Sequence, residues 1–145
     1  MVLLFPVQGS QAPQMGSFLF ENFPVFKQTL SEASEAISFD LRKLIFEGTD
    51  AELALTVNTQ SALLAVQIAT YRTIKSEIPL VFKATAGHSV GEYAALVAAG
   101  AMDFSTAMKA VRLRGQAMQS AVPAGAGGMV AILGLDHDQV AWLCN

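Results

Sequence analysis

The sequence has 145 residues, of which 52% are hydrophobic and 14% charged, and its formal net charge is −3. This length fits one domain, or one domain and a piece of another. Ordinary soluble chains carry roughly 25% charged residues. The low share here indicates extra apolar surface that a partner, or a further part of the same protein, covers.

Residue counts exclude several classes of protein and site. Cys144 is the single cysteine, and His88 and His137 are the only histidines, so we expect no disulfide and no metal site. No apolar run approaches the roughly 18 residues of a membrane span, and the first ten residues lack the basic start of a signal peptide. An acidic chain without a Lys/Arg block is a poor nucleic-acid binder. We therefore expect a cytoplasmic protein that binds neither membrane nor nucleic acid.

The first third of the chain predicts one strand and two helices. The continuous apolar run Val2–Phe5 is typical of a buried parallel strand, and a polar loop follows at 8–16. Pro24–Ile37 is predicted to be helical, with proline in its first turn and Asn22 as its cap. A shorter helix is expected at 40–46.

The middle of the chain predicts a buried helix and a strand that turns sharply into another helix. Residues 58–76 predict a long helix, and the apolar run at 62–69 leaves it almost no polar face until Arg72, which is typical of a helix at the centre of a domain. A second strand is expected at 81–86, a sharp turn at 87–91 and a helix at 92–99. A further helix follows at 103–120, capped by its first residue.

The end of the chain predicts a loop at 123–128, a strand at 129–133 and a last helix. Asp136 and Gln139 have the spacing of a capping box for that helix. Strands that alternate with helices indicate an α/β fold with parallel strand pairing. The change in composition after the proline at 123 marks a candidate boundary between subdomains.

Residues 87–91 read G-H-S-V-G between a predicted strand and a predicted helix, which is the context of a nucleophile elbow. The turn would expose the hydroxyl of Ser89, and the N–H of Val90 would help to hold an oxyanion. The alternative is structural, because Ser89 and Glu92 also have the spacing of a capping box.

Arg114 lies among the apolar positions of the helix at 103–120. A guanidinium stays charged in a protein, so a partly buried one needs an acidic or carbonyl partner. One interpretation is an internal salt bridge to a carboxylate such as Glu92. The other is a fork that binds a substrate carboxylate through two hydrogen bonds.

The loop Gln8-Gly9-Ser10-Gln11 follows the first predicted strand, and such loops build the sites of α/β sheets. Its alternative is an ordinary polar loop. His88 precedes the serine at a turn, where neighbours rarely point the same way, and His137 is expected in solvent. The sequence therefore offers a serine nucleophile without a convincing base.

Taken together, these motifs resemble the malonyl-CoA:acyl carrier protein transacylase family. The matching segments are 5–11, 58–60, 87–93, 112–115 with Met118, 122–123 and 129–134. They occur in order across essentially the whole chain, and G-H-S-x-G-E-Y with a downstream R-G-x-x-M is a specific combination.

The resemblance implies a ping-pong transfer of malonyl from malonyl-CoA to the phosphopantetheine thiol of acyl carrier protein, in fatty acid or polyketide biosynthesis, without a further cofactor. Ser89 would form the acyl-enzyme and Arg114 would bind the malonyl carboxylate. The backbone N–H groups of Gln8 and Val90 would form the oxyanion hole. The residues implied to line the substrate site are Gln60, His88 and Met118.

The resemblance also implies a hydrolase-like parallel-sheet core at 1–122, incomplete, and the start of a small ferredoxin-like subdomain at 123–145. Family members are about twice as long, and their catalytic histidine lies beyond the point that matches Asn145. The chain would therefore need the remaining half, or a self-association partner, to complete the fold. Whether it is active alone stays open at this point.

Val7 stands where the family usually has glycine. If that position needs a positive φ, a β-branched residue would displace the N–H of Gln8 and weaken the oxyanion hole. Docking of an acidic carrier protein would need a local basic patch such as Lys109 and Arg112. The competing functions are a serine esterase or lipase-like hydrolase, and a non-catalytic module that binds acyl carrier protein or CoA.

Overall fold

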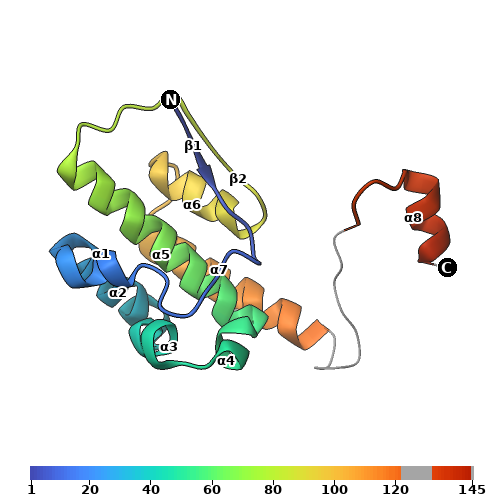
Figure 1. The fold of residues 1–145 in the computed structure, drawn as a ribbon, viewed down its shortest axis with the longest axis horizontal. Coiled ribbons are helices and arrows are strands. Elements are labelled where there is room, and N and C mark those ends of the chain that lie inside the picture. The colour runs from blue at the N-terminus through green and yellow to red at the C-terminus, as the bar shows by residue number, and fades with distance from the viewer. Residues whose placement is uncertain (122–131, 145) are drawn as a thin grey trace.

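The computed structural model describes residues 1–121 and 132–144. Its elements in chain order are β1 (Val2–Phe5), α1 (Ser17–Asn22), α2 (Pro24–Ile37), α3 (Leu41–Glu47), α4 (Asp50–Ala54), α5 (Thr56–Glu77), β2 (Ala84–Gly87), α6 (Val90–Ala98), α7 (Phe104–Ala121) and α8 (His137–Leu143). Figure 1 shows α5 running through the body, and α5 contacts α2, α6 and α7. The architecture is an α/β arrangement with a small parallel sheet.

The two strands of the described residues pair in parallel, with Val2 opposite Ala84 and Phe5 opposite Gly87. Their carboxyl ends therefore meet at one edge, where the loop after β1 and the turn after β2 lie together. The strand expected at 81–86 begins later and ends at Gly87. The prediction that β1 is buried is wrong, because Leu4 is 77% exposed.

The core is centred on α5, as the apolar run at 62–69 predicted. Helices α2, α6 and α7 each bury one stripe against α5. The fully buried large apolar side chains include Phe26, Leu30, Leu41, Ile45, Leu53, Leu64, Ile68, Val90, Met108 and Val111. The site described below is thus built on a packed scaffold at the carboxyl edge of the sheet.

Two short helices, α1 and α4, were not predicted, because six and five residues are too few to show a helical period. The predicted cap of α2 is wrong: Asn22 ends α1, and its side-chain amide donates to the carbonyl of Phe18 at 2.8 Å. Helix α4 has a reciprocal capping box between Thr49 and Glu52, and the hydrogen bonds from Thr49 lower the pKa of Glu52.

The predicted caps of the later helices are confirmed. Asp103 accepts from the N–H of Thr106 at 2.8 Å, and the hydrogen bonds from Thr106 lower the pKa of Asp103. Asp136 and Gln139 form the expected capping box. The loop at 123–128 and most of the strand at 129–133 lie outside the described residues, and Ile132 and Leu133 belong to no strand. No helix in the described ranges is long and apolar enough to cross a membrane.

One face of β1 and α5 carries an open apolar groove of about 560 Å³. Its walls include Leu4, Phe5, Leu63, Val66 and Ile74. The buried Oε1 of Gln67, also on this wall, has no hydrogen-bond partner among the described residues. An apolar face with an orphaned acceptor is typical of a surface that packs against further polypeptide.

Candidate active site

Ser89 stands at the sharp turn between β2 and α6. Its backbone has φ 54° and ψ −113°, outside the regions that non-glycine residues favour. The turn is closed by the N–H of Gly91, which donates to the carbonyl of His88 at 3.0 Å. The Ser89 side chain is exposed and makes no capping hydrogen bond, so the capping-box alternative is wrong. Ser89 has the geometry of a nucleophile elbow.

The two glycines around the serine are required by close backbone approach. A Cβ at Gly87 would lie 2.0 Å from the carbonyl oxygen of Gly91, and one at Gly91 would lie 2.3 Å from that of Phe5. Strand β1 therefore ends directly against the first turn of α6. This contact brings the loop after β1 beside the serine.

The guanidinium of Arg114 lies against the serine. Its Nη2 donates to Ser89 Oγ at 3.0 Å, and its Nη1 donates to Oε1 of Gln60. Arg114 is half-buried, and no carboxylate in the described part of the chain pairs with it. The salt bridge to Glu92 is therefore wrong. The arrangement leaves an unneutralised cation beside an exposed serine hydroxyl, which suits an anionic substrate group.

Arg114 owes its place to a close contact between α5 and α7. A Cβ on Gly115 would lie 2.8 Å from Cα of Val57, so only glycine lets these backbones approach. Beside it, Nη1 of Arg112 donates to the Val57 carbonyl and to Oδ1 of Asn58, each at 3.1 Å. Arg112 also lies over the ring of Phe39 at 4.4 Å, and burial lowers its pKa.

This contact corrects the docking patch that the sequence indicated. The guanidinium of Arg112 binds α5 and stacks on the ring of Phe39. It therefore links α7 to α5 and is not available to bind a partner. Lys109 is exposed on α7.

Replacing Gly115 with alanine should separate α5 from α7 at this point. The contact is with a backbone Cα, so we take the upper end of overpacking costs, about 3 kcal/mol. The helix propensity of alanine returns about 1 kcal/mol, so we expect a net loss of about 2 kcal/mol in the free energy of unfolding. Urea denaturation measures it, with Ala117→Gly on the exposed side of α7 as the propensity control. A Gly115→Ala protein as stable as the parent would show that the helices do not need this approach.

The candidate oxyanion donors lie at the same edge of the sheet. Val90 is the first residue of α6, so its N–H precedes the hydrogen-bond ladder of that helix. Gln8 lies in the loop after β1, where the Val7 carbonyl accepts from the N–H and the hydroxyl of Ser10 at 3.3 and 2.8 Å. Val7 is not among the residues with positive φ, so the strain considered for it is absent. The roles of Gln8 and Val90 stay predictions.

Of the remaining candidate residues, Met118 lies near Arg114, and neither histidine is hydrogen-bonded to Ser89 in the described residues. Met118 lies near the arginine, since Nε2 of Gln60 donates to its Sδ at 3.2 Å. His88 is exposed, and its backbone N–H donates to the carbonyl of Phe5 at 3.3 Å. His137 is exposed on α8, with Nδ1 3.4 Å from Asp138. No hydrogen bond joins either histidine to Ser89 in residues 1–121 and 132–144, and the lining role of His88 stays a prediction.

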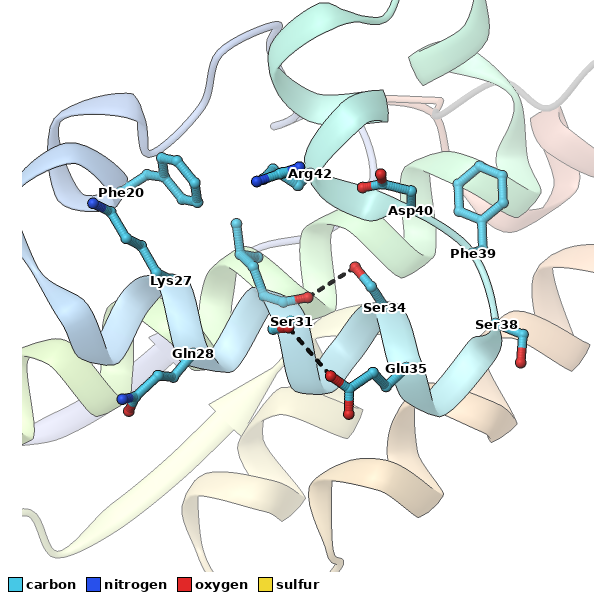
Figure 2. A pocket seen from close by; sticks show the side chains of 11 residues that line it. Phe20, Lys27, Gln28, Ser31, Ser34, Glu35, Ser38, Phe39, Asp40 and Arg42 are labelled. Atoms are coloured by element: carbon cyan, nitrogen blue, oxygen red, sulfur yellow. Dashed lines mark hydrogen bonds between the residues drawn. The ribbon is translucent and has the colours of Figure 1, made fainter.

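A groove of about 680 Å³ opens between α2 and α3, away from these residues. Figure 2 shows Lys27 and Glu35 on α2, with Asp40 and Arg42 across the groove at the start of α3. Two of its serines are occupied within α2: Ser34 donates to the Leu30 carbonyl and Ser31 to Glu35. The mixed charges do not converge on one point, so this groove is a weaker candidate than the serine elbow. No cluster of metal-ligating side chains occurs in the part of the chain that the structure describes.

Comparison with known proteins gives one consistent answer. Residues 2–143 match the acyl transferase domain family. The chain belongs to this family. The malonyl CoA-acyl carrier protein transacylase of Haemophilus influenzae is 46% identical over 144 residues, and that of Bacillus subtilis strain 168 is 51% identical over 135. These alignments cover 99% and 93% of this chain but 46% and 42% of the relatives.

Solved structures of acyl transferases show the same fold. An acyl-carrier-protein S-malonyltransferase from Burkholderia pseudomallei is 49% identical with a TM-score of 0.86, over 99% of this chain and 46% of its own. A malonyl-transacylase solved in complex with a type II PKS acyl-carrier protein is 44% identical with a TM-score of 0.89, over 99% and 46%. The chain thus spans less than half the length of the relatives it matches, and the predicted family resemblance is confirmed.

The sequence analysis did not predict one contact beside this candidate site. Nε2 of Gln67 donates to the carbonyl of Pro6 at 2.9 Å, which ties the loop after β1 to α5. Gln60 and Gln67 are buried amides two turns apart on α5, on either side of the apolar run at 62–66. Their spacing in a helix predicted to be buried could have indicated such contacts, because a buried amide needs a hydrogen-bond partner.

Proposed function

We propose that the chain provides the nucleophile and the carboxylate-binding arginine for transfer of a malonyl group from malonyl-CoA to the phosphopantetheine thiol of acyl carrier protein. The observation that carries the proposal is the hydrogen bond of 3.0 Å from Arg114 Nη2 to Ser89 Oγ, made by a cation without a carboxylate partner in the described residues. An acyl group on that oxygen with a carboxylate at its far end would meet the guanidinium. The names of the relatives agree with this substrate.

In the first half-reaction, Ser89 Oγ attacks the thioester carbonyl carbon and its proton passes to a base. The tetrahedral intermediate places its oxyanion near the N–H groups of Val90 and Gln8. Collapse breaks the carbon–sulfur bond, the base returns the proton to the departing sulfur, and CoA leaves as a thiol with the malonyl ester on Ser89. In the second, the phosphopantetheine thiol attacks that ester and gives its proton to the base, which passes it to Ser89 Oγ as that oxygen leaves. No cofactor takes part beyond these substrates.

The hydrogen bond between Arg114 and Ser89 gives the resting site a defined state. Because guanidinium only donates, Ser89 Oγ acts as the acceptor and its own proton stays free for a base. A bound malonyl carboxylate competes for the same Nη2 donor, so substrate binding releases the serine oxygen where attack is required. Arg114 thereby orients the nucleophile first and the substrate afterwards.

Further polypeptide would complete the fold of this chain. We propose that residues 1–122 form part of a hydrolase-like core and that 123–145 begin a ferredoxin-like subdomain. The polypeptide that makes up the rest of the relatives' length would cover the groove of β1 and α5 and supply the histidine base. Acyl carrier protein would be the second substrate, and the cytoplasm the site of action.

Incubation with malonyl-CoA followed by intact-mass and peptide analysis tests the proposal. We expect one malonyl group on Ser89, and none in Ser89→Ala, when the remaining length of the family is present as the same or a second polypeptide. Malonylation that persists in Ser89→Ala, or is absent from a folded and completed protein, would contradict it. Fast hydrolysis of neutral esters, unaffected by Arg114→Ala, would indicate an esterase instead.

A further inference from the structure

We infer that Gln60 is a positioning residue that fixes the plane of the Arg114 guanidinium while leaving its charge unneutralised, and that Gln60 thereby sets the preference for acyl groups that carry a carboxylate. The inference rests on the proposed role of Arg114 in malonyl transfer. It adds a residue that acts through the arginine and does not touch the reacting atoms.

The first observation is that both ends of the Gln60 amide are engaged. Gln60 lies on α5 and is 1% exposed. Its Oε1 accepts from Arg114 Nη1, and its Nε2 donates to Sδ of Met118 at 3.2 Å. Arg114 and Met118 lie one turn apart on α7. The amide is therefore oriented with its oxygen, and not its nitrogen, toward the cation.

The second observation is that the guanidinium is held at two points. Nη1 is bound to Gln60 and Nη2 to Ser89, and a planar group fixed at both outer nitrogens cannot rotate freely. When an acyl group replaces the second contact, only the first remains. Gln60 is then the contact that keeps the fork directed at the serine.

The third step concerns charge. A glutamate at this position would accept the same hydrogen bond, but it would form a buried ion pair with Arg114. Such a pair would satisfy the cation within the protein and weaken its attraction for a second anion. A neutral amide supplies the geometry without the charge, which is the combination that a carboxylate-binding arginine needs.

Two variants separate these contributions. Gln60→Glu keeps an acceptor and adds charge, so we expect the ratio of Ser89 malonylation to acetylation to fall at least tenfold, with acetylation within about threefold of the parent. Gln116→Glu adds the same charge on the exposed side of α7 and should leave the ratio unchanged. A Gln60→Glu protein with the parental ratio, or with both rates reduced equally, would overturn the inference.

A readout that needs no transfer activity separates this inference from the proposed function. Restricted rotation of the Arg114 guanidinium gives resolved side-chain ¹⁵N–¹H signals, which we expect to average in Gln60→Leu but to persist in Gln116→Leu. Signals identical in the parent and Gln60→Leu would refute the positioning role even if malonyl transfer occurs. Signals lost in Gln60→Leu, in a protein that never takes malonyl, would retain the positioning role and refute both the proposed function and the selectivity.

Discussion

Replacing Arg114 with alanine should lower the kcat/KM for malonylation of Ser89 by roughly two orders of magnitude. The variant removes the charge-assisted hydrogen bonds to the malonyl carboxylate, and truncating one partner of such a pair costs about 3 kcal/mol, or about 150-fold. Acetyl-CoA has no carboxylate to lose, so its transfer should fall much less, through the lost contact to Ser89 Oγ alone. The measurement is the acylation rate with each thioester.

Two further variants serve as controls for the effect of Arg114→Ala. Lys109→Ala removes a cation from the exposed side of the same helix and should leave both rates nearly unchanged. Arg114→Lys keeps the charge but not the planar fork, so it should recover only part of the malonyl rate. Equal losses with malonyl-CoA and acetyl-CoA in Arg114→Ala would mean that the arginine serves the structure and not the substrate.

Replacing Gly91 with alanine should strongly lower the free energy of unfolding. The new Cβ would lie 2.3 Å from the carbonyl oxygen of Phe5 and 2.8 Å from that of Pro6, and neither backbone group can move without shifting β1. We expect a loss of about 3 kcal/mol, at the upper end of overpacking costs, measured by urea denaturation.

The control for this variant lies next to it on α6. Glu92→Ala changes an exposed residue of the first turn and should cost less than about 1 kcal/mol through the helix dipole. A Gly91→Ala protein no less stable than Glu92→Ala would show that β1 and the serine turn are not in close contact. The chemistry of the site would then need a different explanation.

The elements that sequence predicted well are those whose signals are local. The turn at Ser89 was predictable because the glycines, the strand and the helix adjoin it in the chain. Helix α5 was predictable because a run of apolar residues reports burial directly. Arg114 was predicted as a site residue because it interrupts an apolar stripe, but its two alternatives could not be separated by pattern alone.

What escaped prediction depends on contacts between distant residues. The partner of Arg114 is 54 residues away on another helix, and no local pattern indicates whether a polar side chain reaches an amide or a carboxylate. Arg112 was predicted as part of a basic docking patch, because its stacking on Phe39 depends on where the chain returns after α2. The exposure of β1 likewise depends on what lies beside the sheet, and the sequence of one strand does not contain that information.

The backbone conformation that exposes the hydroxyl of Ser89 also lowers the stability of the fold. A serine held at φ 54° and ψ −113° is strained by about 1–3 kcal/mol, whereas glycine adopts such angles freely. Substitution of this serine by glycine would therefore relieve the strain and raise the free energy of unfolding, at the cost of the hydroxyl. Proteins descended from this chain that retain serine here therefore give up some stability to keep the hydroxyl. An inactive descendant with glycine at this position should have a higher melting temperature than an active one.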